Sequence, residues 1–451
     1  MFKQISMTNF KSWRETGPVR LAPLTGFFGA NSSGKSSLLQ MLLLLKQTSE
    51  SSDPNLVLKT GSIQEGYVNL GTAHEITYGS ETQMSLGMVW DVSGPTLSIP
   101  SIDQDSNVKI RELDFKTKIH AEEHRIFVES LRYESGSDFS AVLERQPNNH
   151  YTIRVLVQGS EPRRPQSRPR VYMKPTKCYG FSYEAVDFYR DTEYLRFLEF
   201  LFDWKLSQLY YLGPLREYPR RQYTWGGERP SNVGLKGELA VPALIAGKNQ
   251  KVYESERKTK LNGLQARIAQ WLVELDLAYD FKVQPLYVGS NLYNVKLRRN
   301  QSSPEVLITD VGIGVSQILP VLVLCYYVPE RSTIILEQPE LHLHPSVQAG
   351  LADVFIDVVK RRNIQIVVES HSEHLLRRLQ LRLAEEKIVP QDTALYFCEM
   401  CDGVSMLTEL DVDMFGNIRN WPEDFFGNLA GDVVEAVSTG LNRKIAHANA
   451  S

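Results

Sequence analysis

Leu24-Thr-Gly-Phe-Phe-Gly29-Ala-Asn-Ser-Ser-Gly34-Lys35-Ser36-Ser37 is the stretch that decides the fold, and the apolar pattern LLQMLLLLKQ follows it directly. An apolar run leads into a glycine-bounded loop of the form G-x-x-x-x-G-K-[ST], and a helical pattern begins at the lysine. Successive backbone N–H groups in such a loop, together with the positive end of the helix dipole, surround a phosphate. The stretch therefore predicts a strand, a phosphate-binding loop and a helix.

The side chains of this loop indicate which ligands it takes. Lys35 is expected to reach the β- and γ-phosphates of a nucleotide, and the Ser36 hydroxyl is expected to hold Mg²⁺. We therefore predict ATP and Mg²⁺ as cofactors. The loop residues expected to contact the nucleotide are Gly29, Asn31, Ser32, Ser33, Gly34, Lys35, Ser36 and Ser37.

The composition is that of a folded globular protein. Of its 451 residues 42% are hydrophobic and 23% are charged, which is enough for two or three packed lobes. A net charge of −3 gives no support for a dedicated nucleic-acid-binding protein. The four cysteines suit a reducing compartment, and neither a signal peptide nor a membrane-spanning run is evident. We expect a cytoplasmic protein with no membrane partner.

Three regions of the chain differ in their hydrophobic pattern. Residues 1–180 contain the phosphate loop and then short alternating segments, which predict an antiparallel sheet. Residues 181–300 carry apolar residues at three- and four-residue spacing, which is typical of a helical insertion. Residues 301–451 alternate buried strand patterns with helices, which indicates a parallel sheet covered on both faces. We predict an α/β fold in which the strand of residues 24–28 completes that parallel sheet.

An acid ends one of the buried strand patterns, Thr333-Ile-Ile-Leu-Glu337-Gln338-Pro-Glu340. Because α/β sheets bind ligands at the carboxyl ends of their strands, this segment has the form of a Walker B element. Glu337 is expected to orient Mg²⁺, and the next position normally carries the carboxylate that polarises the attacking water. Here that position holds Gln338, whose amide cannot accept a proton. The sequence predicts slow turnover or a base supplied from elsewhere, and Glu340 is the candidate.

A histidine follows the next buried run, residues 364–368. His371 is expected to donate a hydrogen bond to the γ-phosphate. The same part of the sequence contains three further histidines, His342, His344 and His374. Metal ligation by these H-x-H and H-x-x-H patterns is therefore an alternative.

A glycine-rich turn, TDVGIGVSQ at residues 309–317, precedes another apolar helical pattern. Gly312 and Gly314 present bare N–H groups to an anion at that helix N-terminus. The turn cannot easily serve the phosphate bound by Lys35 of the same chain. If two subunits face each other head to tail, each turn would cap the nucleotide held by the other subunit. An ordinary helix-capping turn is the alternative.

In the order GANSSGKSS, DVGIGVSQ, IILEQPELHLHP and ESHSEH, these motifs resemble ABC-type ATPases of the OLD, SMC and RecF group. HLHP and HSEH are particularly similar to bacterial AAA-family ATPases of the OLD-like branch, and the similarity extends to YLGPLREYPRR and GNIRNWPEDFF. The resemblance implies a P-loop NTPase of ABC-ATPase type and an ATP-dependent homodimer or higher homo-oligomer. It also implies a role in DNA repair or in defence against phage. OLD nucleases carry a Toprim domain, which we do not expect here because the residues after Cys398 are too few for one.

We therefore expect a nucleotide-controlled dimeric switch that acts on a separate effector protein. A stand-alone DNA repair or processing ATPase is the alternative, and a transporter ATPase subunit is disfavoured by the β-rich first lobe. DNA is left open as a partner because two regions are basic. These are residues 159–177 and the loop that contains Arg216, Arg220, Arg221 and Arg229.

Overall fold

A computed structural model gives the fold of the chain. The structure describes residues 1–61, 66–72, 74–92, 94–95, 97–100, 107–122, 125–162, 173–188, 192–248, 252–253, 260–261, 263–422, 437–440 and 443. Of the basic segment 159–177, residues 163–172 lie outside the described residues.

A mostly parallel sheet at the centre of the molecule carries the phosphate loop. In the described part of the chain its strand order is β12-β19-β20-β4-β21-β22. The strands from β12 to β21 are parallel to one another, and β22 is antiparallel to β21. The strands are β12 (Leu209–Leu212), β19 (Thr333–Glu337), β20 (Gln365–Glu369), β4 (Leu24–Gly29), β21 (Thr393–Cys401) and β22 (Val404–Glu409). The α/β class and the parallel core are thus confirmed.

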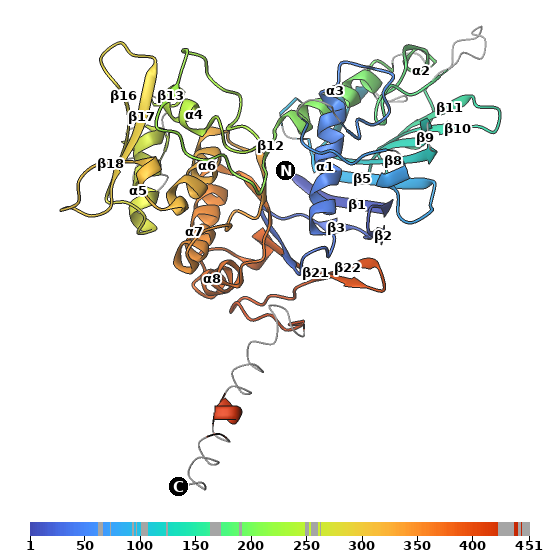
Figure 1. Ribbon diagram of the computed structural model, residues 1–451. Coiled ribbons are helices and arrows are strands. Elements are labelled where there is room, and N and C mark those ends of the chain that lie inside the picture. Colours follow the sequence, from blue (N-terminus) through green and yellow to red (C-terminus); the bar gives the residue numbers. More distant parts are fainter. Residues whose placement is uncertain are drawn as a thin grey trace.

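Helices cover both faces of this sheet (Figure 1). On one face lie α6 (Ile313–Tyr327), α7 (Pro345–Arg362) and α8 (Glu373–Ala384), and on the other lie α1 (Lys35–Ser49) and α3 (Tyr194–Ser207). Helix α1 is buried along nearly its whole length because its leucines pack in a core shared by the central sheet and a second, antiparallel sheet.

Side chains of the central strands alternate between two hydrophobic cores. Ile335 of β19 and Val367 of β20 belong to the core that contains α1 and α3, whereas Ile334 belongs to the core of α6, α7 and α8. This is the two-residue period of a β-strand, and burial on both faces explains the continuous apolar runs in the sequence. By the same period Glu337 and Glu369, two residues further along these strands, lie on the α1 face.

The antiparallel sheet predicted for the first third is present. Its order is β11-β10-β9-β8-β5-β1-β2, and β3 pairs with β1. Strand β8 alternates strictly between exposed and buried residues over most of its length, because one face meets the core and the other meets solvent. The strands are β1 (Phe2–Phe10), β2 (Trp13–Glu15), β3 (Val19–Arg20), β5 (Gln83–Asp91), β8 (Glu112–Glu122), β9 (Arg125–Ser135), β10 (Phe139–Arg145) and β11 (Tyr151–Val157), with a separate pair β6 (Leu97–Pro100) and β7 (Asn107–Ile110).

Two of the short alternating segments in this region, residues 67–70 and 75–78, are not strands. Residues 67–70 form no strand, and residues 75–78 overlap the 3₁₀ turn η1 (His74–Ile76). The backbone of Val68 is satisfied by a side chain, because its N–H donates to Gln47 Oε1 at 3.2 Å and its carbonyl accepts from Gln47 Nε2 at 3.1 Å. The side-chain amide of Gln47 on α1 therefore makes the backbone hydrogen bonds that a neighbouring strand would otherwise make.

The region predicted as a helical insertion, residues 181–300, is only partly helical. Its helices are α2 (Tyr183–Val186), α3, α4 (Ala240–Ala246) and α5 (Leu264–Glu274). Strand β12 belongs to the central sheet, and a small antiparallel sheet contains β13 (Tyr223–Thr224), β16 (Asp280–Pro285), β17 (Leu292–Arg298) and β18 (Val306–Leu307), beside the pair β14 (Val252–Tyr253) and β15 (Lys260–Leu261). The helical pattern of α3 runs on into LYYL, but these residues pair with β19 and form β12, the edge strand of the central sheet. A free strand edge thus decides their conformation.

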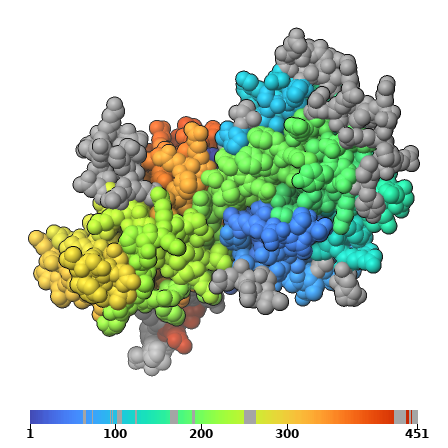
Figure 2. Space-filling model, turned by 90° about the horizontal axis from the view of Figure 1, so that it is seen from above, coloured from blue at the N-terminus to red at the C-terminus, as the bar shows by residue number. Residues whose placement is uncertain are grey.

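Figure 2 shows the molecule as elongated, with the small sheet (yellow) at one end and the N-terminal antiparallel sheet (cyan) towards the other. Among the described residues, no helix combines the length and the apolar character needed to cross a membrane.

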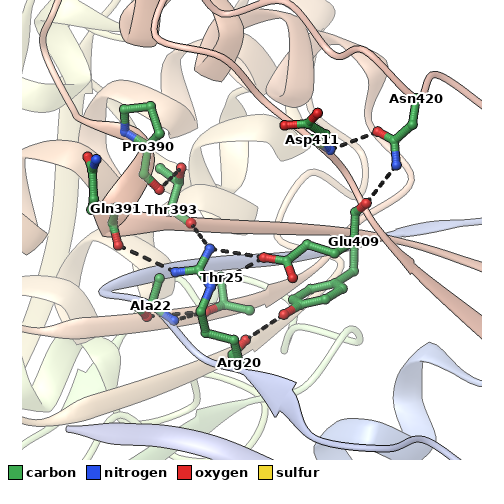
Figure 3. A network of polar contacts seen from close by, with 10 residues as sticks. Arg20, Ala22, Thr25, Pro390, Gln391, Thr393, Glu409, Asp411 and Asn420 are labelled. Atoms are coloured by element: carbon green, nitrogen blue, oxygen red, sulfur yellow. Dashed lines mark hydrogen bonds and ion pairs between the residues drawn. The ribbon is translucent and has the colours of Figure 1, made fainter.

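Arg20 joins the last strands of the central sheet to the N-terminal sheet (Figure 3). Its Nη2 donates to the Thr393 carbonyl at 2.6 Å and to Glu409 Oε1 at 3.0 Å. The Glu409 carbonyl accepts from Asn420 Nδ2 at 2.8 Å, and Asn420 Oδ1 accepts the backbone N–H of Asp411 at 2.7 Å. Asp411 therefore lies in a hydrogen-bonded turn that is attached to β22.

Candidate nucleotide site

The phosphate loop connects the end of β4 to the start of α1. Gly29 has φ +133°, and a Cβ there would lie 2.0 Å from the carbonyl oxygen of Cys398, so the neighbouring strand β21 leaves room only for glycine. Gly34 has φ +92° and precedes α1 without capping it through a side chain. The first N–H groups of α1 are thus directed at the loop, which is the arrangement that binds anions.

The Lys35 side chain lies inside the loop. Only 3% of its surface is exposed, and Nζ donates to the carbonyl oxygens of Gly29 at 3.1 Å and Ala30 at 2.5 Å and to Ser33 Oγ at 3.3 Å. Burial lowers the pKa of this ammonium, and the nearby Glu369 carboxylate opposes that shift. A cation is therefore held at the position where phosphate oxygens are expected.

A cavity of about 250 Å³ opens above the loop and brings together the ends of β4, β19 and β20. It is lined by residues of the phosphate loop and by residues that follow the distant strands β19 and β20 or end them. Its lining residues are Ser12, Asn31, Ser32, Ser33, Gly34, Lys35, Ser36, Ser37, Gln40, Gln338, Glu369 and His371. Residues as far apart in the sequence as Ser36 and Glu369, which are separated by 333 positions, thus line the same cavity.

Glu369 is a site residue that the sequence analysis missed. Its Oε1 accepts a hydrogen bond from Ser36 Oγ at 3.0 Å, and its side chain is 2% exposed. A signal for Glu369 was present in the sequence, because this acid ends a buried apolar run as Glu337 does. In the structure the two acids are paired directly in the β19–β20 register. Trp13, also missed, donates from its indole Nε1 to the Gly34 carbonyl at 3.0 Å and so supports the loop.

Glu337 lies one strand further from the phosphate loop than Glu369. Burial, together with the Glu369 carboxylate, raises the pKa of Glu337 to about 7, while Tyr211 and Arg216 oppose the shift. Arg216 Nη2 approaches the Glu337 carbonyl oxygen at 3.5 Å, and burial lowers the pKa of this guanidinium to about 10. Arg216 is therefore part of the buried surroundings of the site.

The other three arginines of this basic loop, Arg220, Arg221 and Arg229, do not line the cavity above the phosphate loop. Arg220 pairs with Glu217, and Arg221 Nη2 contacts Asp310 Oδ1 at 2.8 Å. Arg229 lies over the ring of Tyr327 at 5.3 Å.

Gln338 and His371 both line the cavity, whereas Glu340 lies behind them. Gln338 has φ +43°, and its N–H donates to the Glu369 carbonyl at 2.9 Å. Glu340 is 7% exposed, and its Oε1 accepts the backbone N–H of His371 at 2.6 Å. Burial and the charge of Lys35 lower the pKa of the His371 imidazole. The neutral imidazole is therefore favoured at the cavity.

Comparison with protein families agrees with this geometry. The family model described as "AAA domain, putative AbiEii toxin, Type IV TA system" matches residues 24–377, which is most of the chain. The chain belongs to this AAA-domain family. A second model, described as "Protein of unknown function (DUF3696)", matches residues 388–435, the segment that begins just before β21. The AAA-domain match spans the phosphate loop, the glycine turn, β19, β20 and His371.

Three of the solved structures that are similar to this AAA-domain protein are heads of SMC proteins. "Crystal structure of the SmcHead bound to the C-winged helix domain of ScpA" is 10% identical, with a TM-score of 0.44, and the match covers 92% of this chain and 98% of that chain. The SMC head domain from Thermotoga maritima is 11% identical, with a TM-score of 0.41 and coverage of 91% and 99%. The Smc head domain with an extended coiled coil bound to the C-terminal domain of ScpA, derived from Pyrococcus furiosus, is 9% identical, with a TM-score of 0.43 and coverage of 91% and 96%. A comparison with curated proteins finds no match.

The glycine turn of this AAA-domain chain lines a different cavity from the phosphate loop. Gly312 is the N-cap of α6, and Gly314 lies in its first turn. Both line a cavity of about 460 Å³ together with Leu277, Arg299 and Asp310. Within one chain, the structure does not bring Gly312 and Gly314 to Lys35.

The remaining histidines do not form a metal site in the described part of the chain. No group of three or more His, Cys, Asp or Glu residues with metal-binding geometry occurs there. His344 is the N-cap of α7 and accepts the Ser346 backbone N–H at 3.3 Å. Asp413 accepts the N–H groups of Phe415 and Asn417 at 2.9 Å, as expected of a turn residue.

The residues at the cavity fit a nucleotide triphosphate with Mg²⁺. The loop offers N–H groups and one ammonium to phosphate oxygens, and the Ser36 hydroxyl and the buried Glu369 carboxylate offer the oxygen ligands that Mg²⁺ prefers. One carboxylate oxygen, Glu369 Oε2, is buried with no hydrogen-bond partner. A cation at this place would satisfy it.

Proposed function

We propose that this protein binds ATP with Mg²⁺ at the phosphate loop, hydrolyses it slowly, and acts as a nucleotide-controlled dimeric switch in a DNA-related or anti-phage defence system. The observation that carries the proposal is the single cavity shared by the phosphate loop, Gln338 and His371. A phosphate loop alone would indicate only a nucleotide, whereas the added strand ends supply the groups that respond to its γ-phosphate.

The residues of this chain divide the work at the cavity. Lys35 and the N–H groups at the start of α1 hold the phosphates, and Ser36 and Glu337 hold Mg²⁺, which neutralises charge on the phosphate oxygens. His371 lines the cavity, and we expect it to hydrogen-bond the γ-phosphate. Its neutral imidazole can donate one hydrogen bond there.

Slow hydrolysis is supported by what surrounds the expected base position. Gln338 lines the cavity there, and an amide does not accept a proton from water. The carboxylate of Glu340 is already bonded to the His371 N–H, which makes Glu340 a support for the histidine segment. A site of this kind stays loaded with ATP for longer than one with a glutamate at the base position.

Dimerisation is supported by the position of the glycine turn. Gly312 and Gly314 start α6 at a cavity separate from that of Lys35, so a second subunit is needed to bring a glycine turn to each nucleotide. The closed dimer would present its outer surfaces to a separate effector protein. The family description names a toxin of a toxin–antitoxin system, which supports a defence role with a separate partner. A stand-alone DNA repair ATPase is the second candidate, favoured by the motif resemblance to the SMC and RecF group.

Sedimentation velocity with and without ATP and Mg²⁺ tests the proposal. The wild-type protein is expected to shift from monomer to dimer on adding ATP, and Lys35→Ala is expected to lose both ATP binding and the shift. Gly312→Asp should bind ATP yet fail to dimerise, because a Cβ at Gly312 meets no atom within 4 Å and the added charge would face the partner's phosphate. Gly226→Asp, at a similarly open glycine, is the control. An oligomeric state that ignores ATP would refute the switch, and DNA cleavage by the purified protein alone would favour the repair enzyme.

A further inference from the structure

The sheet order places a second acid closer to the phosphate loop than the Walker B residue. Strand β20 lies between β19 and β4, so Glu369 is on the strand adjacent to the phosphate-loop strand and Glu337 is one strand further away. Neighbouring strands are about 4.8 Å apart, which is more than the length of a Mg²⁺–oxygen bond. The two acids are paired in register, so they end their strands at the same level.

The contacts of Glu369 and Glu337 also indicate that Glu369 is the acid nearer to the phosphate loop. The Glu369 carboxylate accepts a hydrogen bond from Ser36 Oγ, the hydroxyl expected to bind Mg²⁺, and it lines the cavity. Arg216 approaches the backbone of Glu337, and both Arg216 and Tyr211 interact electrostatically with its carboxylate. Glu337 is thus flanked by groups on the side away from the phosphate loop.

Glu369 also has unused hydrogen-bonding capacity. It is 2% exposed, and Oε2 has no partner, although a buried carboxylate oxygen without one is costly. Lys35 Nζ donates to loop oxygens, and it affects Glu369 only through its charge. A carboxylate that is bonded to the metal-binding serine and has one free oxygen at the cavity has the chemistry of a hard-cation ligand.

We propose that Glu369 positions Mg²⁺ at Ser36, either as a direct ligand or through a metal-bound water, and shares this role with Glu337. The inference rests on the proposed function, because it assumes that ATP occupies the cavity. Glu369 is the last residue of β20 and lies two residues before His371. The metal and His371 would therefore be connected through this short segment of backbone.

Binding of a fluorescent ATP analogue, measured in EDTA and in excess Mg²⁺, tests this role without measuring hydrolysis. Glu369→Gln should bind the analogue in EDTA at least as tightly as wild type, because a negative charge near the phosphates is removed. In Mg²⁺ its gain in affinity should fall by about 10- to 100-fold relative to wild type, the cost typical of groups that orient a metal. Glu399→Gln, an exposed acid on β21, should behave as wild type in both conditions.

A structural role for Glu369 would give a different pattern, because misfolding would weaken binding in EDTA as well. Glu369→Asp serves as the second variant, since it keeps the charge, withdraws the carboxylate by one methylene and should also lose Mg²⁺ dependence. The Mn²⁺ electron spin resonance spectrum of the ATP complex should change in both variants. A wild-type Mg²⁺ dependence in Glu369→Gln would overturn the inference, whereas a wild-type protein that binds no ATP would overturn the proposed function instead.

Discussion

The carboxylate of Glu340 accepts the backbone N–H of His371 at 2.6 Å, so the acid two residues after Gln338 is bonded to the histidine segment. Its other oxygen, Oε2, is buried without a hydrogen-bond partner. This contact ties the turn after β19 to the turn after β20. The two turns that approach the cavity are therefore positioned relative to each other by one side chain.

Removal of this contact should destabilise the protein. Glu340→Ala leaves the His371 N–H without its partner, and we expect the free energy of unfolding to fall by about 1–3 kcal/mol. Glu340→Gln keeps an acceptor oxygen and should cost much less. Thermal unfolding of both variants checks this, and equal losses for Ala and Gln would show that the carboxylate charge matters more than the hydrogen bond.

The Glu337 carboxyl should make stability depend on pH. Burial raises its pKa in the folded protein from 4.5 to about 7, so folding favours the protonated form. The unfolded chain loses this proton at lower pH, so the stability contributed by Glu337 is present below about pH 4.5 and is lost as the pH rises to about 7. A shift of this size corresponds to about 1–3 kcal/mol after allowance for partial solvent access. Melting temperatures between pH 5 and pH 7.5 should fall less in Glu337→Gln than in wild type, and parallel curves would contradict this.

An alanine at Gly29 should disrupt the phosphate loop. Its Cβ would lie 2.0 Å from the Cys398 carbonyl oxygen, at a φ of +133° that is unfavourable for alanine. We expect a loss of about 2–4 kcal/mol, because the clash is with backbone that cannot move without displacing β21. The control Gly226→Ala, where a Cβ meets nothing within 4 Å, should stay within about 0.5 kcal/mol of wild type. Urea unfolding measures both, and a wild-type stability for Gly29→Ala would mean that β4 and β21 are not packed as described.

A glutamate at position 338 should accelerate hydrolysis. Gln338 lines the cavity at the position where a general base is expected, and a positioned base typically contributes about 100-fold or more. Phosphate release by Gln338→Glu is therefore expected to exceed that of wild type by at least about tenfold. Gln348→Glu, on α7, is a control outside the cavity lining. If Gln338→Glu binds ATP normally but hydrolyses it no faster, the base in this protein comes from another residue.

Local patterns were enough to predict the phosphate loop and the central strands β4, β19 and β20. The segment of residues 24–37 is contiguous, so the glycines, the lysine and the flanking apolar runs specify strand, loop and helix together. Strands β19 and β20 were also predicted, because a strand that is buried on both faces has a continuous apolar sequence. The apolar pattern LLQMLLLLKQ after the loop ends at Gln47, and helix α1 ends at Ser49.

Only the tertiary structure decided which of these elements meet. Ser36 and Glu369 are 333 residues apart, and their contact depends on β20 lying beside β4, which no local period encodes. Likewise LYYL continues a helical pattern and becomes strand β12 because β19 offers it an edge, and Val68 bonds to Gln47 instead of to a strand. Sequence periodicity reports how a segment is buried, and strand order determines what it is buried against. The nucleotide loop could therefore be predicted from the sequence, while the contact between its Ser36 and Glu369 is set by the assembled sheet.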